Sequence, residues 1–242
     1  MKILGIIPAR FQSSRFPGKP LVEISGKPLI IWVCEIVEKA LGNDNTIVAT
    51  DDDRIAAVVK KHGFNFIMTS SEHLTGTDRL AEVSRKIEAD IYINIQGDEP
   101  LINPNDILNI AELKKQFPSN IINAMAYISE DEDPDSVNIP KVIVNPNSDL
   151  VYMSRLPVPG NKQNNREFKY LKQVCIYAFN KAELDLFYNH PSKTPLEKQE
   201  DIEILRFLEL GRKIKMVHLE SSSLAVDVPE DIKKIEDALR IK

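Results

Sequence analysis

LGIIPARFQSSRFPGKPL (residues 4–21) sets the architecture of the chain. An apolar run typical of a buried strand ends in a loop that carries Arg10, Arg15 and Lys19. The loop contains one glycine, Gly18, so it lacks the spacing of the common phosphate-binding motifs. Three cations in one pocket repel one another unless an anion lies between them, and a polyphosphate accepts a charge-assisted hydrogen bond from each. The stretch therefore predicts a strand followed by a phosphate site; the alternative is a set of surface ion pairs.

Composition limits the classes of partner. The 242 residues include 31 Lys and Arg against 36 Asp and Glu, which gives a net charge of −5, and 43% of them are hydrophobic. No block of five like charges occurs, so we expect no nucleic-acid partner. No apolar run approaches the roughly 20 residues that cross a bilayer, and the first run is too short for a secretory signal. We therefore expect a cytoplasmic protein that does not bind membranes, with Cys34 and Cys175 as reduced core thiols.

Strand-like and helical patterns alternate over the first half of the chain. The expected strands are 3–7, 45–50, 64–70 and 90–95, and the expected helices are 28–42, 53–62, 78–88 and 104–117. Such alternation predicts the α/β class, with a mostly parallel sheet and helices on both of its faces. Ligands of these sheets bind outside the carboxyl ends of the strands.

The rhythm changes after about residue 121. The patterns indicate strands at 122–129, 141–145, 149–154, 173–179 and 213–219, and helices at 180–189, 196–211 and from 229. The second and third of these strands flank the turn NPNSD, which predicts a hairpin. We find no repeat or linker, so we predict a single domain over 1–242 with a hairpin-bearing insertion at about 121–175.

Two aspartates are candidate metal ligands. Asp98 follows an apolar strand and a glycine in NIQGDEP, and Mg²⁺ is usually held by one or two carboxylates together with substrate phosphates. Asp227 also follows an apolar run, in AVDVPEDI, and could reach the same metal from a distant part of the chain. The alternative for Asp227 is a role in starting the helix that follows it.

Four motifs carry a resemblance to a known family. They are IIPARFQSSRFPGKPL (6–21), GTDRLAEV (76–83), ADIYINIQGDEPLI (89–102) and AVDVPEDI (225–232). Over nearly its whole length the chain resembles the 3-deoxy-manno-octulosonate (Kdo) cytidylyltransferases. The resemblance implies a Rossmann-like nucleotidyltransferase fold and a homodimer that uses the hairpin-bearing region. It also implies Mg²⁺-dependent transfer of CMP from CTP to a 3-deoxy-2-keto sugar acid, for lipopolysaccharide, capsule or another glycoconjugate.

The resemblance also suggests roles for individual residues. The expected catalytic residues are Arg10, Arg15 and Lys19 around the triphosphate, with Asp98 and Asp227 as metal ligands. The expected CTP-binding residues are Arg10, Arg15, Lys19, Thr77, Asp78 and Arg79. The expected sugar-acid-binding residues are Gln96, Arg155, Gln173, Glu203 and Ile204.

Two positions depart from the family pattern, and both belong to the acceptor half. Gln173 stands where a histidine is usual, and Ile204 stands where a glutamine is usual. The acceptor could therefore be Kdo, a modified Kdo or another nonulosonic acid. An idle sugar-nucleotide sensor is a second possibility. A glycosyltransferase is a third, because Asp51–Asp53 mimics a D-x-D metal motif, although these acids also suit the start of a helix.

Overall fold

The computed structural model describes residues 1–12, 16–160, 162, 168–220 and 224–241. Its strands are β1 (Ile3–Ala9), β2 (Glu23–Ile24), β3 (Lys27–Pro28), β4 (Thr46–Thr50), β5 (Asn65–Met68), β6 (Ile91–Ile95), β7 (Ile121–Tyr127), β8 (Lys141–Val144), β9 (Leu150–Ser154), β10 (Leu171–Phe179) and β11 (Ile214–His218). Its helices are α1 (Leu29–Leu41), α2 (Asp53–Lys61), α3 (Gly76–Lys86), α4 (Pro104–Gln116), α5 (Lys181–Tyr188), α6 (Pro195–Glu200), α7 (Ile204–Glu209) and α8 (Asp231–Ile241), with short 3-10 helices η1 (Lys19–Leu21) and η2 (Asn43–Asn45).

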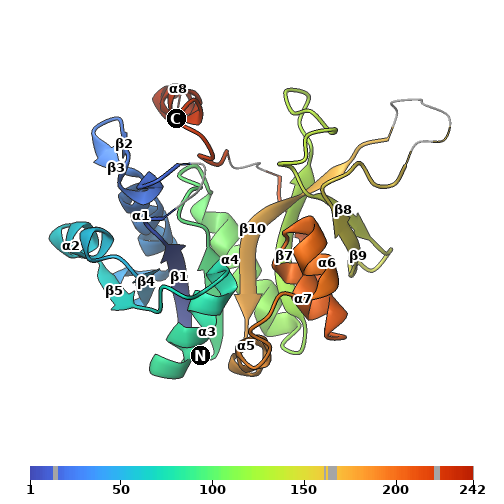
Figure 1. Ribbon diagram of the computed structural model, residues 1–242, viewed down its shortest axis with the longest axis horizontal. Helices are drawn as coiled ribbons and strands as arrows, with labels where there is room; N and C mark the ends of the chain where they lie inside the picture. The colour runs from blue at the N-terminus through green and yellow to red at the C-terminus, as the bar shows by residue number, and fades with distance from the viewer. Residues whose placement is uncertain (13–15, 161, 163–167, 221–223, 242) are drawn as a thin grey trace.

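One mixed sheet runs through the molecule. Its strands follow the order β11-β7-β10-β6-β1-β4-β5, with β8 pairing to β10 and β9 pairing to β8 (Figure 1). The neighbours β6, β1, β4 and β5 are parallel, whereas β10 is antiparallel to β6, β7 and β8. The prediction of a mostly parallel sheet is confirmed, and β8 with β9 forms the predicted hairpin.

Helices cover both faces of the sheet, as predicted. Apolar side chains of α1, α2 and α4 share one core cluster, which includes Ile30, Val37, Ile55, Ile107 and Ile110. Apolar side chains of α3, α5 and α7 share a second cluster, which includes Leu80, Leu184, Leu205 and Phe207. Because the sheet separates the two clusters, the carboxyl ends of its strands remain open as a rim between the layers. Within the described ranges, no helix combines the length and the apolar character needed to span a bilayer.

Two helix boundaries differ from the predicted ones, and a third decides between two interpretations of the aspartates at 51–53. The expected helix 196–211 is divided into α6 and α7, because Asp201 takes a left-handed conformation with φ of 51°. α3 begins two residues before the predicted 78, since Thr75 and Asp78 form a capping box. Asp52 caps α2 and Asp53 starts it, which supports the helix-start interpretation of the aspartate triplet.

Gly5 brings α1 close to the centre of the sheet. A Cβ atom at Gly5 would lie 2.4 Å from Val37 Cγ1 and 2.9 Å from Leu41 Cδ1.

We expect Gly5→Ala to lower the free energy of unfolding by about 1–3 kcal/mol, because α1 must shift away from β1. Urea denaturation measures this change. Gly160→Ala is the control, since a Cβ there meets nothing within 4 Å, and equal stability of the two variants would contradict the packing argument.

Candidate active site

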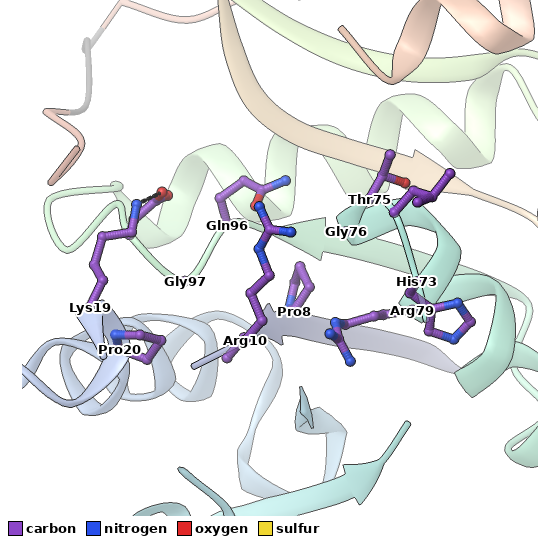
Figure 2. Close-up of a pocket in the computed structure, with 13 residues that line it drawn as sticks. Pro8, Arg10, Lys19, Pro20, His73, Thr75, Gly76, Arg79, Gln96 and Gly97 are labelled. Carbon is purple, nitrogen blue, oxygen red and sulfur yellow. Dashed lines mark hydrogen bonds and ion pairs between the residues drawn. The ribbon is translucent and has the colours of Figure 1, made fainter. Parts of the chain in front are cut away.

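A cleft lies at the carboxyl ends of the parallel strands. It consists of two adjoining cavities of about 210 and 720 Å³. Both cavities are lined by Arg10, Leu74, Thr75, Gln96 and Asp98, so they form one continuous space. Figure 2 shows the smaller cavity, with side chains from the first loop, from the segment before α3 and from the end of β6. The cleft lies where the topology of the sheet predicts a ligand.

Lys19 joins three distant segments at the mouth of the cleft. Gly18 has a φ of 73°, a conformation that favours glycine, and it precedes the short helix that begins at Lys19. Lys19 Nζ donates hydrogen bonds to Asp98 Oδ2 (2.5 Å, the dashed contact in Figure 2) and to the carbonyl of Val226 (2.9 Å). Asp227 Oδ1 lies 4.0 Å from the same ammonium. Both predicted metal ligands therefore approach one predicted phosphate-binding cation.

Backbone hydrogen bonds hold Asp227 in this position. The amide of Val226 donates to the carbonyl of Asp98 (2.9 Å), which fixes the segment before α8 beside the end of β6. Asp231 Oδ2 accepts hydrogen bonds from the amides of Asp227 (3.0 Å) and Val228 (3.1 Å). Partial burial acts against ionisation of Asp231, but these two amides lower its pKa overall. The chemistry of the helix start thus belongs to Asp231, and the Asp227 side chain faces Lys19.

The two carboxylates suit a hard divalent cation. Among the described residues, no group of three or more His, Cys, Asp or Glu side chains could hold a metal ion. Mg²⁺ does not need such a cage, because it is commonly bound by one or two carboxylates together with water and substrate phosphates. The donor set formed by Asp98 and Asp227, open toward the cleft, fits this requirement.

Arg10 lines both cavities. Its side chain is exposed, and Figure 2 shows it extending beside Gln96. It has no hydrogen bond or ion pair with another described side chain, so its guanidinium can meet a ligand. Arg15, the third predicted cation, lies outside the described residues.

Thr77, Asp78 and Arg79, at the start of α3, were predicted to bind CTP. Of these three residues, Arg79 lines a cavity. Arg79 lines the smaller cavity and donates to Asp51 Oδ2 (2.8 Å), to Thr69 Oγ1 (2.7 Å) and to the carbonyl of Ser70 (3.1 Å). These bonds fix its guanidinium at the cavity wall.

Thr77 and Asp78 line neither cavity. The Thr77 amide donates to Glu203 Oε2 (3.1 Å), and Asp78 accepts from Thr75 and from Arg206 Nη1 (3.2 Å). In this structure the two residues lie behind the wall that Thr75, Arg79 and Glu203 form, and their contact with CTP stays a prediction.

His73 also lines the smaller cavity, although no sequence pattern assigned it a function. Its Nε2 lies 2.6 Å from Glu82 Oε2. Burial acts against ionisation of Glu82, but Lys86, the Ser70 amide and His73 lower its pKa to about 2. Glu82 is therefore a carboxylate at neutral pH and orients the imidazole ring.

Arg155, predicted to bind the sugar acid, lies in the wall of the larger cavity. Its guanidinium donates to the carbonyls of Val137 (2.7 Å), Asp201 (2.9 Å) and Glu200. These bonds connect two segments of the wall and leave two guanidinium N–H groups for other partners.

Gln173 and Glu203 line the larger cavity as well. Gln173 Nε2 donates to Asn123 Oδ1 (3.1 Å) and to Tyr177 Oη (3.2 Å). Burial raises the pKa of Glu203, and its Oε1 has no hydrogen-bond partner among the described residues.

Ile204 does not belong to the cavity. It is fully buried in α7 and packs in the second core cluster. In this structure Ile204 faces the core, because it begins a helix whose apolar side packs on the sheet, and its contact with the sugar acid stays a prediction.

Sequence reasoning missed several charged residues of the larger cavity, among them Glu132, Lys172, Lys193 and Asp201. Lys172 pairs with Glu132, and Lys193 pairs with Asp201 (2.5 Å). Lys172 interrupts an apolar strand and could have been suspected for that reason. The other three lie in polar loops or turns, where a charge is unremarkable.

Comparisons with known proteins identify the family of the chain. The family model described as cytidylyltransferase matches residues 4–214. A 3-deoxy-manno-octulosonate cytidylyltransferase of Escherichia coli is 39% identical over 97% of this chain and 94% of its own length, and one of Bdellovibrio bacteriovorus is 38% identical over 99% and 98%. The solved structure of a CMP:2-keto-3-deoxy-manno-octonic acid synthetase complexed with CTP has a TM-score of 0.91 and 38% identity, and it covers 100% of this chain and 99% of that one. The chain belongs to the 3-deoxy-manno-octulosonate cytidylyltransferase family.

Proposed function

We propose that this protein transfers CMP from CTP to the anomeric hydroxyl of a 3-deoxy-2-keto sugar acid of the Kdo type and releases pyrophosphate. The observation that carries the proposal is the convergence of Lys19, Asp98 and Asp227 beside a cavity large enough for a second substrate. Family membership supports the same reaction. An idle sensor would not need this convergence of a cation with two carboxylates.

The residues of the first loop would hold the triphosphate. Lys19 and Arg10 line the smaller cavity and supply charge-assisted hydrogen bonds, and Arg15 is assigned to the same task by resemblance. Phosphoryl and nucleotidyl transfer need alignment and stabilisation of charge more than a covalent intermediate. Such cations fit an in-line attack of the sugar hydroxyl on the α-phosphorus.

Asp98 and Asp227 would hold Mg²⁺. When bound there, the ion would supply positive charge to the phosphate oxygens. In the protein described here the Lys19 ammonium lies between the two carboxylates, so it stabilises them in the absence of substrate.

The hairpin-bearing region would form a homodimer. Val151, Leu156 and Phe168 are exposed apolar residues of this region, and exposed apolar groups on one surface mark interaction sites. We expect Leu156→Asp to reduce the dimer fraction measured by light scattering at micromolar concentration. A protein that is monomeric before the substitution would contradict this part of the proposal.

The proposal is tested first at Asp98. We expect pyrophosphate release from CTP and Kdo to require a divalent metal and to fall about 100-fold or more in Asp98→Asn, because a metal ligand is lost. Glu230→Gln, which changes an exposed carboxylate outside both cavities, should retain activity. Thermal unfolding checks that Asp98→Asn is folded. Near-normal turnover in that variant would remove the metal role.

Lys19 tests the phosphate end separately. We expect Lys19→Met to raise the KM for CTP about 10-fold to 100-fold, the cost of one lost hydrogen bond to a charged group, with a smaller effect on the KM for the sugar acid. Lys39→Met, an exposed lysine on α1, is the matched control. Equal losses for both substrates would show that Lys19 acts only on the structure.

A further inference from the structure

The amide of Gln173 is held in one orientation by its neighbours. Asn123 is completely buried, and its Nδ2 donates to the carbonyls of Val174 (2.9 Å) and Ile176 (3.0 Å), where β10 has a bulge. Both Nδ2 hydrogens are thereby used, and a flipped Asn123 would place its oxygen against two carbonyl oxygens. Asn123 Oδ1 must therefore act as an acceptor.

This requirement fixes Gln173 in turn. Its Nε2 donates one hydrogen to Asn123 Oδ1 and the other to Tyr177 Oη. A flipped Gln173 would bring its own oxygen to about 3 Å from Asn123 Oδ1, an unfavourable contact between two acceptors. Gln173 can therefore offer only Oε1 to the cavity that it lines, and this oxygen has no hydrogen-bond partner among the described residues.

The surroundings of Gln173 are also acidic. Glu99 and Glu203 line the same cavity, and Glu203 Oε1 has no partner in the described part of the chain. Burial first, and then charges that include Glu99 and Glu203, raise the pKa of both Cys175 and Tyr177. The part of the cavity around Gln173, its floor, thus combines the acceptor oxygen of Gln173 with the carboxyl groups of Glu99 and Glu203.

Cations line this cavity as well, and most of them have partners of their own. Lys172 is paired with Glu132, and Lys193 is paired with Asp201. Lys234 is paired with Asp231, and Arg155 donates to the backbone carbonyls of Val137 and Asp201. Arg10 also lines this cavity, so its charge acts on the same ligand space as the carboxyl groups.

We propose that Gln173 is a specificity-determining residue, which selects a sugar acid whose substituent at the cavity floor donates hydrogen bonds. A hydroxyl or an ammonium group meets this condition, because each donates a hydrogen bond to Oε1. A keto, methoxy or deoxy substituent does not meet it. This inference rests on the proposed function, because it concerns the acceptor of that reaction.

The experiment measures kcat/KM at saturating CTP for Kdo and for analogues in which one hydroxyl at a time is replaced by amino, methoxy or hydrogen. At the position that reaches the floor, we expect methoxy and deoxy analogues to lose about 10-fold to 100-fold, the cost of leaving a buried acceptor unpaired. The amino analogue should stay within about threefold of Kdo, because its ammonium group also donates a hydrogen bond. Loss of no more than twofold at every position would overturn the inference, whereas no pyrophosphate from any acid would overturn the proposed function.

Variants separate recognition from folding. Gln173→Leu should reduce the discrimination between hydroxyl and methoxy to less than threefold while leaving the KM for CTP unchanged. Gln173→Glu keeps an oxygen at the floor and adds charge, so it should increase the preference for the amino analogue. Gln116→Leu, at the exposed end of α4, is the control. It should change neither the discrimination between hydroxyl and methoxy nor the preference for the amino analogue. If Gln173→Leu retains full discrimination, or if Gln173→Glu disfavours the amino analogue, Gln173 does not select the acceptor.

Discussion

The ion pair between Lys19 and Asp98 is the contact on which the site depends. The two residues lie 79 positions apart, and the same ammonium also binds the carbonyl of Val226, 207 positions away. Two carboxylates near one point repel each other, and the energy rises as water is excluded. Lys19 offsets this repulsion between Asp98 and Asp227. It therefore gathers three segments of the chain before any substrate arrives.

A second set of buried charges holds the opposite wall of the cleft. Arg206 is completely buried and pairs with Glu197 (2.6 Å) and with Asp78 (3.2 Å), so α6 and α7 are joined to the start of α3. Removing one member of such a group leaves an uncompensated buried charge, which costs about 3–5 kcal/mol. The geometry of Thr75 and of Glu203 depends on this arrangement, because the capping box and the Thr77 amide place them at the cavity.

Sequence patterns predicted what depends on local periodicity. The strand before Arg10 and the helix from Leu29 follow from apolar spacing, and Asp98 follows from its place after a strand. The division of the expected helix at Asp201 could not be predicted, because it requires a left-handed residue that local propensity disfavours. Ile204 was assigned to the acceptor from family resemblance, but its position on the core side of α7 depends on that same break.

The two ends of the cleft are built in different ways. The phosphate end uses side chains that directly follow strands, so short motifs reveal it. The end at the larger cavity uses bonds from side chains to backbone carbonyls: Lys141 Nζ, for example, donates to the carbonyls of Ser136, Ile139 and Arg155, and Lys141 is completely buried. Such bonds fix the shape of the wall without fixing which groups face the cavity. Under the proposed function, a change at a residue such as Gln173 would therefore alter the acceptor while Arg10 and Lys19 stay in place at the smaller cavity.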